Sequence, residues 1–257
     1  MTTVLVLHAH PDDESIFTGA TIRRLADTGA RVVLVAATCG ELGASRLPLA
    51  HDETLAERRL AELEWAAERL GVARLALLGR RDSGMPGSAD NVHPGALACA
   101  DTDRLARRVA QLALAESASA LVYDDPQGIY GHPDHVAVHR IGRRAAAMVG
   151  VTGYEVTVDR EHVGRATDHL LHSAAAATGC RYGLPSSEIS LTLAATADEL
   201  AAKRAAIGLH ASQVESAALS GPHVEESYRF EWFRRSGPPA ALDDIVAEPS
   251  FVAAWSS

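Results

Sequence analysis

Two short stretches of the sequence hold residue types that bind metal ions and move protons. They are HPDDE at residues 10–14 and HPDH at residues 132–135. His10, Asp13 and His135 supply two imidazoles and one carboxylate, a ligand set that suits zinc and leaves a fourth position for water. Water at such a position has a pKa near ~7. We therefore expect hydrolytic chemistry at one zinc ion (Zn²⁺) per chain, with Fe²⁺ or another divalent ion as an alternative.

The two adjacent aspartates of the first stretch are expected to do different work. Neighbouring side chains diverge, so Asp13 can bind the metal while Asp12 takes a proton from the water. A helix beginning near Glu14 would place its positive end beside both carboxylates and keep them ionised. An aspartate pair before a helix is often only a helix cap. The presence of both stretches, HPDDE and HPDH, each after a predicted strand, instead favours a shared site. His139, one turn after His135, is a rival ligand that we interpret as a packed or exposed helix histidine.

The elements around these stretches alternate between short apolar strands and longer helices. Strands are predicted at residues 4–7, 31–37, 75–78 and 120–123, and helices at 14–28, 54–70, 101–116 and 135–149. This alternation is typical of an α/β, Rossmann-like fold with a mostly parallel sheet and helices on both faces. With strand order 3-2-1-4-5, the loops after the first and fourth strands meet at the carboxyl edge of the sheet. The two stretches should therefore form one site.

The last third of the chain is less regular. It contains candidate strands at residues 154–158 and 189–193, a helix at 197–210, and an irregular tail from about residue 236. We find no internal repeat and no low-complexity linker. We therefore expect a single domain over residues 1–257.

Composition limits the classes of partner. The formal net charge is −9, which argues against nucleic acid as a partner. The three cysteines, without a CxxC, favour a reducing compartment. No segment approaches the ~20 apolar residues of a membrane span, and no leader pattern precedes the first strand. We expect a cytoplasmic protein with no membrane partner, and homo-oligomer formation stays open.

Around these motifs the sequence resembles the LmbE-like (PIG-L) superfamily. The resemblance runs from Val4 to about Gln213, and its anchors are HAHPDDES at 8–15, TCGELG at 38–43, RLAE at 59–62, RDSGM at 81–85 and YGHPDH at 130–135. The superfamily includes GlcNAc-phosphatidylinositol de-N-acetylases and the sugar deacetylase and conjugate amidase of the mycothiol pathway.

The resemblance implies roles for individual residues. It makes His10, Asp13 and His135 the zinc ligands and Asp12 the general base that later acts as an acid. It implies that His132 stabilises the tetrahedral intermediate or protonates the leaving amine, and that Asp134 orients and charges His132. It also implies that Tyr130 helps to polarise the scissile carbonyl. Contacts to sugar or polyol hydroxyls are implied for Glu41, Arg59 and Asp82.

Three functions are weighed on this basis. The first is a zinc-dependent hydrolase that removes an N-acyl group, expected to be acetyl, from a small amino-sugar-type substrate. The second is a metal-dependent amidase of a thiol conjugate or a secondary-metabolite intermediate. The third is a non-catalytic sugar- or nucleotide-binding module. HPDD stands where a GxGxxG turn would follow the first strand, which disfavours nucleotide binding, and the presence of the base and all three ligands disfavours a non-catalytic sugar-binding protein.

Overall fold

The computed structural model describes residues 1–165, 169–220 and 224–246. Within these ranges, seven strands form one sheet in the order β3-β2-β1-β4-β5-β7-β6. Their bounds are β1 Thr3–His8, β2 Arg31–Ala36, β3 Arg74–Leu77, β4 Ala120–Asp124, β5 Thr152–Thr157, β6 Leu191–Ala194 and β7 Phe230–Ser236. The first five strands are parallel, and β7 and β6 add an antiparallel edge. The prediction of a mostly parallel sheet in the order 3-2-1-4-5 is confirmed.

The central strands are buried on both faces, which explains their near-continuous apolar sequences. Along β1, Val4 and Val6 pack into one core, while Leu5 and Leu7 pack into a second core on the opposite face. Side chains alternate between faces along a strand, so one short run serves both cores.

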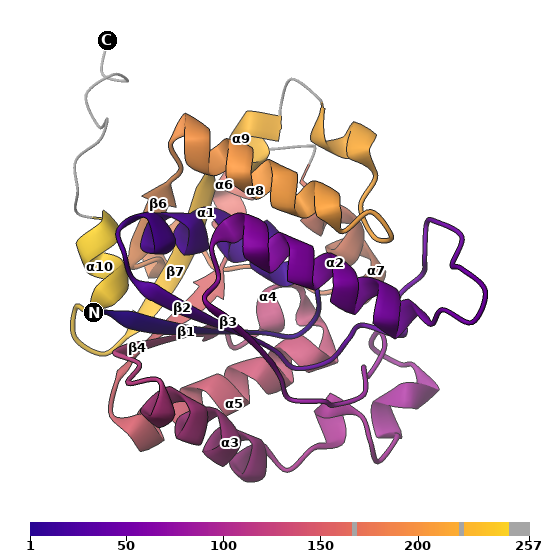
Figure 1. The fold of residues 1–257 in the computed structure, drawn as a ribbon, viewed down its shortest axis with the longest axis horizontal. Coiled ribbons are helices and arrows are strands. Elements are labelled where there is room, and N and C mark those ends of the chain that lie inside the picture. Colours follow the sequence, from indigo (N-terminus) through magenta and orange to yellow (C-terminus); the bar gives the residue numbers. More distant parts are fainter. Residues whose placement is uncertain (166–168, 221–223, 247–257) are drawn as a thin grey trace.

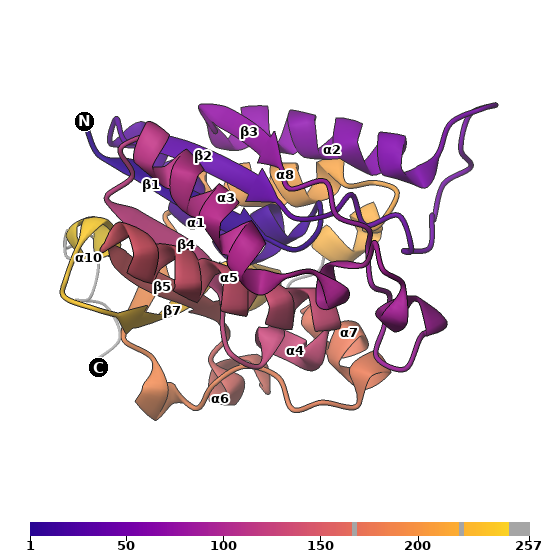
Figure 2. The same ribbon diagram turned by 90° about the horizontal axis from the view of Figure 1, so that it is seen from below.

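Helices cover both faces of the sheet, as the two ribbon views show (Figures 1 and 2). The first core is closed by α1 (Asp13–Asp27), α2 (Leu55–Leu70) and α8 (Ala197–Leu209). The second is closed by α3 (Thr102–Ala115) and α5 (Pro133–Val149). The shorter helices are α4 Gly128–Gly131, α6 Arg160–Val163, α7 Leu171–Thr178, α9 Val224–Tyr228, α10 Ala241–Val246, η1 Ala89–Val92, η2 Leu97–Cys99, η3 Ser186–Glu188 and η4 Ser216–Leu219.

Local sequence explains where the long helices begin and end. A capping box, in which Thr54 and Glu57 bond reciprocally to backbone N–H groups, starts α2. Gly71, at φ 84°, ends α2 in the left-handed conformation that glycine adopts without penalty. A second capping box, Thr196 with Glu199, starts α8. These signals account for the close agreement between the predicted and observed bounds of both helices.

The structure differs from the prediction in the last third of the chain. Strand β7 was not predicted, and it lies between β5 and β6, pairing antiparallel with both. The irregular tail expected from about residue 236 instead contains α10, because Leu242 and Ile245 are buried in the first core. Residues 247–257 of that predicted tail lie outside the described residues. A single continuous sheet supports the proposal of one domain.

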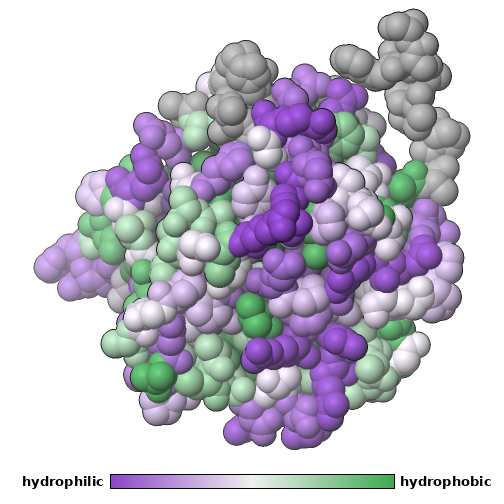
Figure 3. All heavy atoms as spheres, turned by 180° about the vertical axis from the view of Figure 1, so that it is seen from behind, coloured by the Kyte–Doolittle hydropathy of each residue, from purple (hydrophilic) through white to green (hydrophobic). Residues whose placement is uncertain are grey.

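Among the described residues, the most exposed large apolar side chains after Met1 are those of Val92, Leu114 and Trp65. Figure 3 shows hydrophilic and apolar residues interspersed over one face of the molecule. Across the part of the chain that the structure describes, no helix has the length and apolar character needed to cross a membrane.

Candidate active site

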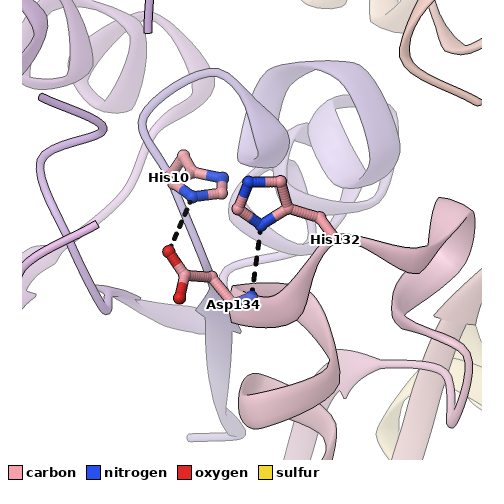
Figure 4. Close-up of side chains that lie close together, drawn as sticks. All are labelled: His10, His132 and Asp134. Carbon is pink, nitrogen blue, oxygen red and sulfur yellow. Dashed lines mark hydrogen bonds and ion pairs between the residues drawn. The ribbon is translucent and has the colours of Figure 1, made fainter. Parts of the chain in front are cut away.

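The loops that follow β1 and β4 meet, as the strand order predicts. Strands β1 and β4 are neighbours, paired in parallel. The ring of His10, after β1, therefore lies 4.7 Å from that of His132 and 5.2 Å from that of His135, measured between centroids. Figure 4 shows His10 facing His132 and Asp134 across the gap between the two loops. Residues more than 120 positions apart, such as His10 and Asp134 with a separation of 124, are thus brought together.

Three buried side chains at this point can hold a metal ion. Oδ2 of Asp13 lies 3.7 Å from His10 Nδ1 and 3.4 Å from His135 Nε2. A tetrahedral zinc ion with bonds of about 2.0–2.1 Å sets its ligands about 3.3 Å apart, so these separations fit. The backbone N–H of His10 also donates to Asp13 Oδ2 at 2.8 Å, which fixes that carboxylate. The structure thus brings together the three residues predicted as zinc ligands, and their role as ligands stays a prediction.

A second group, His10 with His132 and Asp134, also brings three ligand atoms together. Hydrogen bonding favours the first group over this one. Asp134 Oδ2 is 3.2 Å from His10 Nε2 and accepts from the backbone N–H of Ser83 at 3.0 Å, while Ser83 Oγ donates to its other oxygen. A carboxylate in this position fixes the proton on Nε2 and leaves Nδ1 of His10 free to bind a metal.

The second histidine ligand is oriented in the same way by Asp124, at the end of β4. Asp124 Oδ2 lies 2.8 Å from His135 Nδ1, and its Oδ1 lies 3.3 Å from His8 Nδ1. Burial alone would raise the pKa of Asp124, but His135 and His8 lower it to about 2, so the carboxylate is ionised. Nε2 of His135 is thereby left facing Asp13. Sequence reasoning missed both His8 and Asp124, whose only signal is a polar residue ending a buried apolar strand.

Replacing Asp124 with asparagine should weaken metal binding about 10–100-fold, the usual effect of removing such an orienting carboxylate. The dissociation constant, measured by competition with a chromophoric chelator, checks this expectation. Asp27→Asn is the matched control, because that carboxylate is 54% exposed and pairs with Arg23 on the surface of α1. Equal metal affinity in Asp124→Asn and wild type would show that His135 needs no such partner.

Asp12 is held in an unusual conformation beside the metal-ligand candidates. Its φ of 107° and ψ of −30° lie outside the regions that residues with a Cβ prefer, at a cost of about 1–3 kcal/mol. Its carboxylate lies 3.2 Å from a guanidinium nitrogen of Arg59. Burial raises the pKa of Asp12 to about 6, with a further increase from Asp13, although Arg59 opposes the change. A carboxylate that titrates near neutrality suits general base catalysis.

His132 caps the N-terminus of α5. Its Nδ1 accepts from the backbone N–H of Asp134 at 3.2 Å, so a neutral ring carries its proton on Nε2. Burial, His10 and His135 lower the pKa of His132 to about 2, which keeps the ring neutral. The structure differs here from the expectation that the Asp134 carboxylate orients His132. That carboxylate contacts His10 and Ser83, and His132 is oriented by the backbone N–H of Asp134.

Tyr130, expected to polarise the scissile carbonyl, lies beside the same ligand set. Its Oη is 3.2 Å from His135 Nε2. Burial and the nearby Asp13 raise the pKa of Tyr130 well above its usual value, so the hydroxyl keeps its proton and can donate. The preceding residue, Ile129, has φ 57°, a conformation that is rare for a β-branched side chain.

Comparison with known proteins agrees with this geometry. Residues 5–146 match the PIG-L family, described as GlcNAc-PI de-N-acetylase. The chain belongs to the PIG-L family. A deacetylase from Kineococcus radiotolerans, named 1D-myo-inositol 2-acetamido-2-deoxy-alpha-D-glucopyranoside deacetylase, is 39% identical over 248 residues, covering 82% of this chain and 68% of that protein. The protein of the same name from Nocardiopsis dassonvillei is 35% identical over 261 residues, covering 89% and 92%.

Solved structures share the fold of this PIG-L chain. The N,N'-diacetylchitobiose deacetylase from Pyrococcus horikoshii superposes with a TM-score of 0.61 at 22% identity, covering 91% of this chain and 84% of that one. Deacetylases of the PIG-L family are metal-dependent, and the prediction of a metal-dependent N-deacetylase or amidase is confirmed.

The three residues expected to contact hydroxyl groups lie near the PIG-L site but differ in what they touch. Asp82 is 4% exposed, accepts from Gly84 N at 2.8 Å, and has Oδ1 3.8 Å from His10 Nε2. Glu41 Oε1 accepts from the backbone N–H of Asp82 at 3.0 Å. Arg59 is also buried, and its guanidinium donates to the backbone oxygens of Gly40 and Pro11. Arg59 therefore holds the loop after β1, and a contact from it to substrate stays a prediction.

Proposed function

We propose that this protein is a zinc-dependent N-deacetylase that hydrolyses the acetamide of an N-acetylglucosamine-type sugar, with an inositol glycoside as the leading candidate. The observation that carries the proposal is the buried set of His10, Asp13 and His135 with Asp12 beside it. Support for the sugar comes from the relatives at 39% and 35% identity, whose names specify an N-acetylglucosaminide of inositol.

The ligand set defines what a metal would contribute. With zinc held by His10, Asp13 and His135, the site would polarise the amide carbonyl and lower the pKa of water. Nδ1 of His10 and Nε2 of His135 are the nitrogens left for it, because carboxylates occupy the other ring positions.

The remaining residues would transfer the proton and stabilise the oxyanion. Asp12 would accept a proton from the water molecule while the oxygen of that water attacks the carbonyl carbon. The same proton would then pass to the departing nitrogen as the carbon–nitrogen bond breaks, because an amide anion is a very poor leaving group. Nε2–H of His132 and the hydroxyl of Tyr130 would donate hydrogen bonds to the oxyanion that forms meanwhile. The products are acetate and a free amino sugar.

Substrate preference tests the sugar half of this proposal. Carboxylates such as Glu41 and Asp82 accept hydrogen bonds from hydroxyl groups, so a hydroxyl-rich ring should bind better than a simple acyl amine. We expect kcat/KM for the N-acetylglucosaminyl inositol to exceed that for N-acetyl amino acids by more than about tenfold, the effect of one charge-assisted hydrogen bond. Release of free amine, measured by fluorogenic labelling, provides the comparison.

The same panel should include an amide of a thiol conjugate. A preference for that compound would favour the alternative amidase function, and a preference for acetyl amino acids would exclude sugar recognition. Glu41→Gln should raise KM for the sugar while leaving KM for an acetyl amino acid unchanged, which ties the preference to this side chain. We also propose a cytoplasmic location, which the free thiols of Cys39, Cys99 and Cys180 support.

A further inference from the structure

The strained backbone of Asp12 is held by a buried pair that the sequence alone did not connect. Oε2 of Glu14 accepts from the backbone N–H of Asp12 at 3.0 Å. Oε1 of the same carboxylate lies 2.7 Å from Nε2 of His210 and also accepts from Ser15 Oγ. Glu14 is 1% exposed and His210 is fully buried, so the contact is shielded from water. Both oxygens of Glu14 are thus engaged.

The pair joins two distant parts of the fold. His210 follows α8, is 196 residues from Glu14, and is brought to it because α8 packs along α1. Neither Glu14 nor His210 belongs to the three-residue groups that can hold a metal.

Arg59 completes the restraint from the other side. Its guanidinium donates to the backbone oxygen of Pro11 and lies 3.2 Å from Asp12 Oδ2. The peptide unit before Asp12 and the carboxylate of Asp12 are therefore fixed by Arg59, while the backbone N–H of Asp12 is fixed by Glu14. A residue at φ 107° keeps that conformation only when its surroundings determine it, and these contacts do so.

We propose that Glu14 and His210 are positioning residues for Asp12, holding its backbone in the positive-φ conformation that places its carboxylate for proton transfer. This inference rests on the proposed function, in which Asp12 is the base. His210 acts through Glu14, and Glu14 acts through one hydrogen bond to the backbone of Asp12. The role is distinct from metal binding, so substitution of His210 should lower the catalytic rate without lowering the metal content.

Substitution of His210 tests the proposal directly. His210→Ala should lower kcat about 10–100-fold, because a small misplacement of a catalytic group has effects of this size. KM and metal content should stay within about twofold of wild type. His210→Gln should recover most of kcat, since its amide nitrogen can replace Nε2 as donor to Glu14. The matched control is His51→Ala, because the side chain of His51 is 97% exposed and should leave all three quantities unchanged.

A double variant tests the assumed chain of contacts. If His210 works through Glu14, then Glu14→Gln/His210→Ala should be no slower than the slower single variant. Additive losses in kcat would overturn the proposal, as would wild-type kcat in folded His210→Ala. Loss of metal in parallel with kcat, or a glutamine variant as slow as the alanine variant, would assign His210 a structural role instead. Circular dichroism and thermal melting establish that each variant is folded.

A readout that does not depend on activity separates this inference from the proposed function. Crystal structures of wild type and His210→Ala should show Asp12 at positive φ in the first and relaxed to negative φ in the second. Positive φ retained in the variant would overturn the positioning role. A wild-type enzyme that is inactive on every N-acetyl sugar would instead contradict the proposed function, while the crystallographic comparison would still decide the role of the pair.

Discussion

Asp12→Asn is expected to lower kcat by about 10²–10⁴, which corresponds to about 3–5 kcal/mol of activation free energy. The amide cannot accept the proton that the attacking water loses, nor deliver it to the departing nitrogen. Metal content and KM should stay near wild type, because Asp12 lies next to the ligand candidates but outside the group His10, Asp13 and His135. Steady-state kinetics and elemental analysis on the same preparation measure both quantities.

Asp13→Asn is the matched comparison, since it makes the same chemical change one residue away. Oδ2 of Asp13 faces both His10 and His135, so this variant should lose metal first and activity as a consequence. The opposite pattern, with metal lost from Asp12→Asn and kept by Asp13→Asn, would mean that the two roles are reversed. Near-normal kcat in Asp12→Asn would show that another group of the site is the base.

Removal of the metal should abolish activity, and His135→Ala should have the same effect. The variant leaves His10 and Asp13 as the only members of the favoured ligand set, and two ligands hold a divalent ion far more weakly than three. We expect about one zinc ion per chain in the wild type and almost none in the variant after dialysis against a chelator. Restoration of activity in chelated wild type by added Zn²⁺ or Fe²⁺ identifies the ion that works best.

His139→Ala provides the control for this experiment. His139 lies one turn further along α5 and is buried, but its Nδ1 is 3.0 Å from the backbone oxygen of Asp124 and 3.8 Å from Glu155. The variant His139→Ala should therefore keep its metal even if its thermal stability falls. Full metal occupancy in His135→Ala, or loss of metal only in His139→Ala, would remove His135 from the ligand set.

The parallel part of the sheet and the meeting of its two loops could be predicted from the sequence because the signals are local. Strands β1 and β4 are continuous apolar runs, and each is followed by a motif of metal-binding residue types. The C-terminal edge gave no such signal. Strand β7, FEWFRRS, mixes aromatic and charged residues, because Glu231 is buried against α1 and Lys203 while Arg234 and Arg235 are only partly buried.

The partners of the site residues could not be predicted in the same way. The sequence places Asp134 next to His132, but in the structure its carboxylate is turned to His10. That choice depends on Ser83, which approaches from the loop after β3. Asp124 and Arg59 are similar cases, because their partners come from other elements and no spacing in the sequence records them.

The contact between Glu14 and His210 also has a consequence for the order in which the enzyme matures during synthesis. A chain growing from its N-terminus contains His10, Asp13 and His135 once residue 135 has been added, but His210 is added 75 residues later (210 − 135). Residues 136–209, which include α8, must be added before His210, and α8 must pack along α1 before His210 reaches Glu14. The residues proposed to bind the ion are therefore complete in the growing chain before the residue proposed to position Asp12, so this restraint is among the last contacts of the site that the chain can form.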